Sequence, residues 1–267
     1  MGRIIAAFLM QRRSFIVTAG VGALAAAYGN LSGSVRAPRK HRVVELELIT
    51  VMSLLNEDFR GTLSNVAAIG YEEVETLGSM GRAPAEVRSI LEACHLTSPS
   101  QHLVPQDLYG VYQQWDRGVI TMAQALDQFI RAFNLAGDLR QREGLTFAYH
   151  NGSKVFQRIG IDVAHELILR HTNVHAVKME LDTYYAFKAG ADVLTYFARF
   201  PGRFPLLHLK DLDRAGEITD LGRGTIDFTA VLHAATLSWV QHMFVEHDRA
   251  RDPLASARSS FEYVRAL

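Results

Sequence analysis

Short apolar segments alternate with longer amphipathic ones from Val43 to the end of the chain. The apolar segments are rich in β-branched and aromatic residues and end at turn residues, so they predict β-strands. The segments between them follow a helical spacing, with Pro84 near the start of one and Gly70 at the end of another. The expected strands are VVELELIT (43–50), EEVETL (72–77), SPSQHLV (98–104), LTFAYHN (145–151), HAVKMELD (175–182), FPLLHLKD (204–211) and WVQHMFVEHD (239–248).

This repeated alternation predicts an α/β fold with a parallel sheet. The number of repeats in residues 43–267 favours a closed (β/α)8 TIM barrel over an open sheet. One strand is missing from the pattern, because residues 103–144 contain two helical stretches and between them only the short apolar run GVIT (118–121). We therefore expect a barrel that is incomplete around its fourth strand, unless GVIT forms a rudimentary one.

Ionisable side chains recur where the expected strands end. In a TIM barrel these ends lie together at the carboxyl-terminal face, where the chemistry of such barrels is found. A set of histidines and carboxylates at one rim matches the ligands of Mn, Mg, Co or Zn ions. The residues in question are Glu75, His102, His150, Asp182, His208 with Lys210 and Asp211, and Glu246 with His247.

Each of these side chains also has a purely structural interpretation. His102 and His150 are each as consistent with a hydrogen-bonded structural histidine as with a ligand. Glu75 is compatible with a salt bridge at the rim, and Asp182 with the N-cap of the helix that follows. For Asp182, His208 and Glu246 taken together, we favour the metal site.

The N-terminal 42 residues predict an export signal and a linker rather than part of the barrel. Arg12 and Arg13 precede an apolar stretch rich in Ala and Gly, which ends in the small residues Ala25–Ala27. This layout is typical of a twin-arginine signal, so we expect export to the periplasm by the twin-arginine machinery and no membrane span after cleavage. Met10 is an alternative start of the chain.

Composition narrows the classes of partner. The formal net charge is zero and no stripe of Lys and Arg is evident, so a nucleic-acid-binding surface is not expected. The single cysteine, Cys94, excludes an internal disulfide and is expected to be a small buried residue.

Several longer motifs resemble one family, the sugar phosphate isomerase/epimerase proteins with a xylose isomerase-like TIM barrel. They run from about Val44 to the C-terminus and are DFRGTLSNVAAIGYEEVE, FAYHN, MELDTYYAFKAGAD, PGRFPLLHLKD, GRGTIDF and FVEHDRARDPLASARSSFEYVR. The resemblance implies a metal at the barrel mouth with Asp182, His208 and Glu246 as ligands and His150 as the fourth. It also implies that Lys210 faces the substrate.

The sequence departs from the family pattern at three places. After FAYHN the family continues with a second histidine and an Asp-Phe-Glu-Phe run, whereas this chain has Gly152 and Ser153. The first strand lacks the usual aromatic residue and arginine. The glycine loop has Arg223 where an acidic residue is common.

These residues together predict a metal-dependent isomerase or epimerase that acts on a sugar or keto-sugar through an enediolate. Glu246 is the expected base, Glu75 the candidate on the other side, and Lys210 the group that stabilises the oxyanion. His102, Asn151 and His247 are expected to bind the substrate. The alternatives are a lyase or hydratase on an oxidised sugar, a degenerate carbohydrate-binding barrel, and, far behind, a zinc endonuclease. A homo-oligomer is compatible with the sequence.

Overall fold

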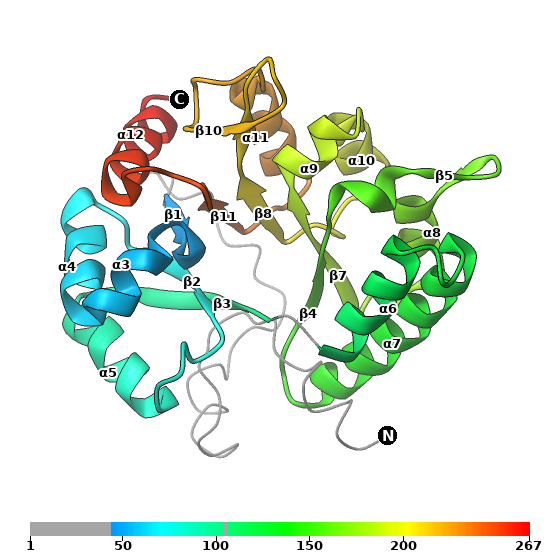
Figure 1. Cartoon of the computed structure of the whole chain (residues 1–267), viewed down its shortest axis with the longest axis horizontal. Helices are drawn as coiled ribbons and strands as arrows, with labels where there is room; N and C mark the ends of the chain where they lie inside the picture. The colour runs from blue at the N-terminus through cyan, green and yellow to red at the C-terminus, as the bar shows by residue number, and fades with distance from the viewer. Residues whose placement is uncertain (1–43, 104–105) are drawn as a thin grey trace.

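The structure is a computed structural model that describes residues 44–103 and 106–267. The expected signal and linker, residues 1–42, lie outside the described residues. The described chain forms one parallel sheet with helices on its outer side (Figure 1). Its strands are β1 (Glu45–Glu47), β2 (Glu73–Leu77), β3 (Thr97–His102), β4 (Phe147–His150), β7 (Val177–Asp182), β8 (Leu206–Leu209) and β11 (His242–Val245).

The sheet curls into a TIM barrel that lacks one strand. Its order is β3-β2-β1-β11-β8-β7-β4, and every neighbouring pair is parallel. β3 and β4 are therefore the two edges, each with one strand neighbour among the described residues. The expectation of an (β/α)8-type barrel that is incomplete around its fourth strand is confirmed.

The segment between β3 and β4 explains the missing strand. It folds as two helices, α6 (Gln106–Asp116) and α7 (Met122–Arg142). The run GVIT (118–121) is a turn in which Thr121 caps α7, so the alternative of a rudimentary strand is wrong. The hydroxyl of Thr121 accepts a hydrogen bond from the Gln124 N–H, and the side-chain oxygen of Gln124 accepts one from the Thr121 N–H.

The other helices follow the strands as the pattern indicated. Polar residues at their N-caps satisfy free N–H groups, as Asp58, Asp192, Asp227 and Asp252 do. These helices are α3 (Met52–Glu57), α4 (Phe59–Ile69), α5 (Pro84–Ala93), α8 (Ala164–His171), α9 (Thr183–Lys188), α10 (Val193–Arg199), α11 (Phe228–Leu237) and α12 (Pro253–Ala266).

Short elements fill the loops. Two antiparallel pairs are present, β5 (Arg158–Ile159) with β6 (Asp162–Val163) and β9 (Asp211–Leu212) with β10 (Ile218–Thr219). β1 is shorter than expected because the Glu47 side chain accepts a hydrogen bond from the Ile49 N–H and starts the 3-10 turn η1 (Leu48–Val51). A second such turn, η2 (Ser153–Phe156), follows β4.

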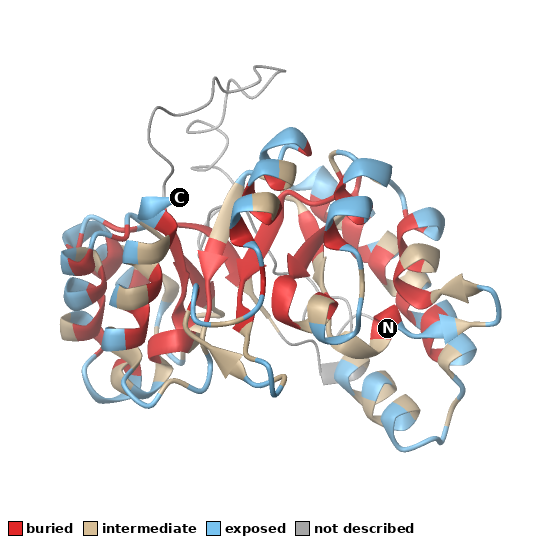
Figure 2. Ribbon diagram, turned by 90° about the horizontal axis from the view of Figure 1, so that it is seen from above, coloured by how far each residue is buried: buried red, intermediate tan, exposed pale blue. Residues whose placement is uncertain are grey.

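The core lies between the strands and the helices that cover them (Figure 2). Cys94 is buried there as expected. At the amino-terminal end of the sheet, the ring of His242 bonds to the carboxylates of Glu45 and Glu73 at 2.8 and 3.0 Å and so joins β11, β1 and β2. None of the described helices combines the length and apolar character that crossing a membrane requires.

Candidate functional site

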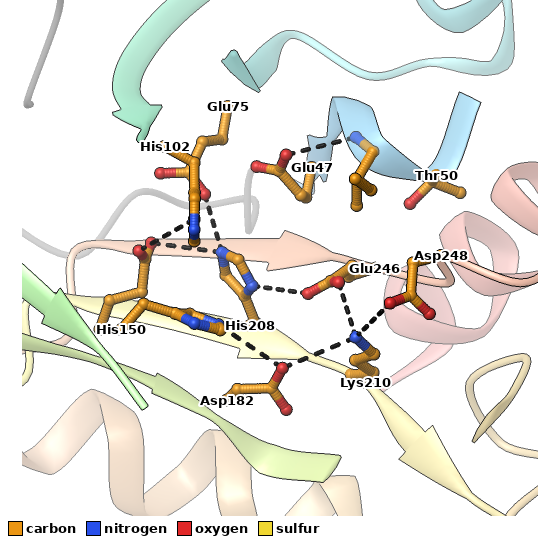
Figure 3. Close-up of polar contacts among 12 residues, drawn as sticks. Glu47, Thr50, Glu75, His102, His150, Asp182, His208, Lys210, Glu246 and Asp248 are labelled. Carbon is orange, nitrogen blue, oxygen red and sulfur yellow. Dashed lines mark hydrogen bonds and ion pairs between the residues drawn. The ribbon is translucent and has the colours of Figure 1, made fainter. Parts of the chain in front are cut away.

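A cluster of buried histidines and carboxylates occupies the carboxyl-terminal end of the sheet (Figure 3). Residues two apart in an extended chain face the same side, so His208 on β8 and Lys210 directly after it both point inward. Asp182 on β7 is the register partner of His208. The side chains that meet there are Glu75, His102, His150, Asp182, His208, Lys210 and Glu246.

His208 lies at the centre of the cluster. Its Nδ1 is 2.6 Å from Glu246 Oε2, and its Nε2 is 2.7 Å from Glu75 Oε2 and 3.3 Å from Glu180 Oε1. Burial alone would lower the pKa of His208, but the carboxylates of Glu180 and Glu246 raise it well above its usual value. These carboxylates therefore favour a protonated ring, and a metal could bind through Nδ1 only after that nitrogen loses its proton.

The carboxylates that receive these hydrogen bonds are ionised. Burial alone would raise the pKa values of Glu75 and Glu246, but the hydrogen bond and charge of His208 lower both. Glu75 has both oxygens engaged, since Ser100 Oγ also donates to it. Glu75 is buried, and its ion pair with His208 agrees with the salt-bridge alternative that the sequence left open.

Lys210 pairs with carboxylates on the side of Glu246 opposite His208. Its Nζ lies 2.7 Å from Glu246 Oε1, 3.2 Å from Asp248 Oδ2 and 3.8 Å from Asp182 Oδ2. Burial would lower the pKa of Lys210, but these three carboxylates raise it. The lysine is thus a buried ammonium directed at the same space as His208.

Asp182 combines the two roles that the sequence left as alternatives. Its Oδ1 accepts the N–H of Tyr185 and caps α9. Its Oδ2 is buried without a hydrogen-bond partner in the described structure and lies 3.5 Å from His150 Nε2, which is equally unpartnered. One carboxylate therefore ends a strand, starts a helix and leaves an oxygen for a ligand.

Four of these residues form a group that could hold a metal ion. One ligand atom each from His150, Asp182, His208 and Glu246 lies within 4.8 Å of the others. These four are the ligands that the sequence predicted. The orphaned oxygen of Asp182 and nitrogen of His150, together with this nitrogen and oxygen donor set, fit a divalent cation.

Glu180 and Glu47 are buried members of the site that the sequence reading missed. Glu180 forms a second such group with Glu75, His102 and His208, and neither of its oxygens has a hydrogen-bond partner in the described chain. Burial and then the charge of Glu75 raise the pKa values of both Glu180 and Glu47. The alternation of acidic with apolar residues in VVELELIT and in KMELD was the signal that could have found them.

Acidic groups outnumber the cations of the site. Five carboxylates are buried in it, from Glu47, Glu75, Glu180, Asp182 and Glu246. Lys210 and the protonated His208 offset part of this charge. Burial and then the charge of His150 lower the pKa of His102 to about 4. Such an excess is costly in a buried setting unless protons or a cation balance it.

Two expected substrate contacts are engaged elsewhere. Asn151 is buried, and its amide bonds the backbone N–H and C=O of Asp182 at 3.1 and 3.4 Å, so it positions that residue. His247 lies 2.9 Å from Asp220 and 3.0 Å from Ser256. The structure does not bring either side chain into the group of four.

Asp211 also serves the loop rather than the cluster. Its carboxylate accepts the N–H groups of Gly222, Gly224 and Ile226, which orders the glycine loop. A Cβ at Gly224 would lie 2.2 Å from Asp211 Oδ1, so only glycine fits there. Arg223, one of the sequence departures, is exposed and approaches Asp220 at 3.9 Å.

The fold and the cluster define a class of protein: a parallel α/β barrel with a histidine and carboxylate site at its carboxyl-terminal face. Residues 82–267 match the family of the xylose isomerase-like TIM barrel, and the chain belongs to that family. No curated protein matches the sequence. The family expected from the sequence motifs is confirmed.

Solved structures share the fold at low sequence identity. A sugar phosphate isomerase/epimerase from Parabacteroides distasonis superposes with a TM-score of 0.70 and 21% identity, over 88% of this chain and 97% of that one. A D-allulose 3-epimerase from Methylomonas sp. superposes with a TM-score of 0.62 and 12% identity, over 85% of this chain and 98% of that one. The probable 3-DHS dehydratase of Bacillus anthracis superposes with a TM-score of 0.61 and 10% identity, over 84% of this chain and 98% of that one.

Proposed function

We propose that the protein is a divalent-metal-dependent isomerase or epimerase that acts on a sugar or keto-sugar through an enediolate intermediate. The observation that carries this proposal is the convergence of His150, Asp182, His208 and Glu246 within 4.8 Å. The sugar isomerases and epimerases among the solved structures of this fold support the reaction class. Export through a twin-arginine signal is part of the same proposal.

His150, Asp182, His208 and Glu246 would hold the ion. Bound there, a divalent cation polarises a sugar carbonyl and its adjacent hydroxyl, so that the neighbouring C–H becomes more acidic. Glu75, bonded to Nε2 of His208, fixes the orientation of the ring and keeps Nδ1 directed at the other ligands. Glu75 is also the candidate for a base on the other side of the site, as predicted from the sequence.

Glu246 is the base of the proposed reaction. Lys210 and His208 keep its carboxylate ionised in a buried place. Because they also lower its basicity, proton removal requires a C–H made acidic by a polarised carbonyl. Lys210 also presents an ammonium that stabilises negative charge developing on a substrate oxygen. Returning the proton to another carbon gives isomerisation, and returning it to the other face gives epimerisation.

The test is metal content of the purified chain after reconstitution, measured beside Asp182→Asn. Asn caps helices as well as Asp does, so the variant removes the charge and keeps α9 capped. Wild type is expected to bind about one divalent ion per chain and the variant far less, because a carboxylate ligand is lost. Asp127→Asn, an exposed aspartate of α7, is the matched control.

The chemistry is tested by exchange of carbon-bound hydrogen with heavy water across a panel of sugars. Exchange in wild type and none in Glu246→Gln is the expected result. Exchange accompanied by loss of water from an oxidised sugar would replace the isomerase with a lyase. A chain that stays free of metal after reconstitution would contradict the proposal and favour a non-catalytic carbohydrate-binding barrel.

A further inference from the structure

A pocket with an aromatic wall lies between the two edge strands of the sheet. Its volume is about 230 Å³, and residues of β3, α6, α7, β4 and η2 form it. The helices α6 and α7 pack against each other, and α7 packs on β4. Seven aromatic rings line the pocket: Tyr109, Tyr112, Trp115, Phe129, Phe133, Phe147 and Tyr149.

The pocket is continuous with the metal cluster. His102 and His150 belong to both, and their ring centroids are 4.9 Å apart across the gap left by the missing strand. The ring of His150 is in turn 4.7 Å from that of His208. A molecule held at the cluster therefore has the pocket beside it.

The pocket has free space at Gly152. A Cβ built at this residue meets no atom within 4 Å, and its φ of −101° is one that any residue adopts. Lys154 closes one side, where its ammonium lies 5.7 Å from the ring centroid of Tyr112 and 5.8 Å from that of Trp115 and pairs with Asp116.

The residues that line the pocket favour an apolar ligand. Among the side chains that the structure describes, the pocket lining includes no carboxylate or amide, and its polar residues are His102, His150, Lys154 and three tyrosines. A second sugar ring would leave most of its hydroxyls without partners there, which is costly. A dry cavity of about 150 Å³ accepts a benzene ring, so this volume has room for one ring with a substituent.

We propose that this pocket binds an apolar ring, such as an aryl group, that the substrate carries next to its sugar part. The protein would then act on ring-substituted sugars rather than on free sugars. The sugar half of this statement rests on the proposed function, while the ring half rests on the pocket alone. The missing fourth strand makes the space for the substituent.

The experiment compares phenyl β-D-glucoside with methyl β-D-glucoside by calorimetry on the full chain. Burying the phenyl group should tighten binding by about tenfold or more. A Trp239→Phe background leaves Trp115 as the only tryptophan, so its fluorescence should respond to the phenyl compound. Gly152→Leu fills the open space and should abolish the preference, and Tyr112→Ala should reduce it.

Gly110→Leu is the matched control, because Gly110 also faces open space but does not line the pocket. It should keep the preference. Equal affinities for the two glucosides, no binding of the phenyl compound at about 10 mM, tighter binding of cellobiose, or a preference that survives Gly152→Leu would overturn the proposal.

The same titrations on Asp182→Asn separate the two proposals. Apolar burial does not need the ion, so the phenyl preference should persist in this variant even where metal binding is lost. In wild type, no phenyl preference with full metal content would refute only the pocket, whereas absence of metal with a phenyl preference would refute only the proposed reaction.

Discussion

His165 is the buried histidine with the fewest polar contacts in the described chain. Neither of its ring nitrogens has a hydrogen-bond partner, and the rings of Phe156 and Tyr196 pack against it at 4.8 and 5.1 Å. Burial and then the charge of Arg203 lower its pKa to about 3. It is therefore neutral when folded and packs as an apolar side chain.

The lowered pKa of His165 predicts a loss of stability in acid. An unfolded histidine titrates near pH 6.5, so the contribution is complete above that pH and is lost as the pH falls toward 3. Between pH 7 and pH 5 this group should cost about 2 kcal/mol of unfolding free energy. Urea unfolding with a chelator present should show a smaller pH dependence in His165→Leu, while His171→Leu, at an exposed position, should behave as wild type. Equal pH dependence in all three chains would contradict the assignment.

At the scale of elements, two glycines in the helices beside the missing strand differ in what surrounds them. Gly137 on α7 lies against β7, where an added Cβ would be 2.7 Å from the Ala176 carbonyl oxygen and 2.8 Å from Val177 Cγ2. Gly110 on α6 has open space at the same position. The close approach of α7 to the sheet thus depends on the absence of one methyl group.

These surroundings predict opposite effects for the same substitution. Gly110→Ala should stabilise the chain by up to about 1 kcal/mol through helix propensity. Gly137→Ala gains the same propensity but clashes with backbone, so a net loss of about 1–3 kcal/mol is expected. Chemical denaturation of both variants measures the difference, and a stabilised Gly137→Ala would show that α7 can move away from β7.

At the scale of the whole molecule, the strands of the open sheet differ in the number of neighbours with which they pair. β8 and β11 each pair on both sides, while β3 and β4 pair on one side among the described residues. Helix α7 packs on β4 and α6 packs on α7, but neither adds a strand to the sheet. The two edges are therefore the places where the barrel opens at the lowest free energy.

Hydrogen exchange should report this difference directly. Amides of β3 and β4 are expected to exchange faster than those of β8 and β11, because fewer ladder bonds must break to expose them. Uniform protection across all seven strands would mean that the missing strand does not weaken the barrel.

Removal of the proposed ion should lower the stability of the whole barrel. The ligands come from four strands, β4, β7, β8 and the end of β11, so a cation that binds only the folded chain stabilises it by mass action. A chelator should reduce the melting temperature of wild type and leave that of Asp182→Asn unchanged. The same shift in both chains would place the ion elsewhere.

The sequence alone determined the strand pattern and most of the residues at the strand ends. Period-two alternation fixes which side chains of a strand share a face, and parallel strands end at one rim, so Asp182, His208 and Glu246 could be placed together without coordinates. The lack of a full apolar strand segment between the two helical stretches of residues 103–144 likewise predicted the lost strand.

Only the tertiary structure decided which partners those residues have. Contacts such as Glu180 with His208, or Asn151 with the backbone of Asp182, join positions far apart in the chain, and no local pattern specifies them. The same holds for the aromatic pocket, since it exists only because α6 and α7 pack beside an open sheet edge. Local periodicity specifies the side of a strand on which a side chain lies. Which other side chains it meets depends on how distant segments pack.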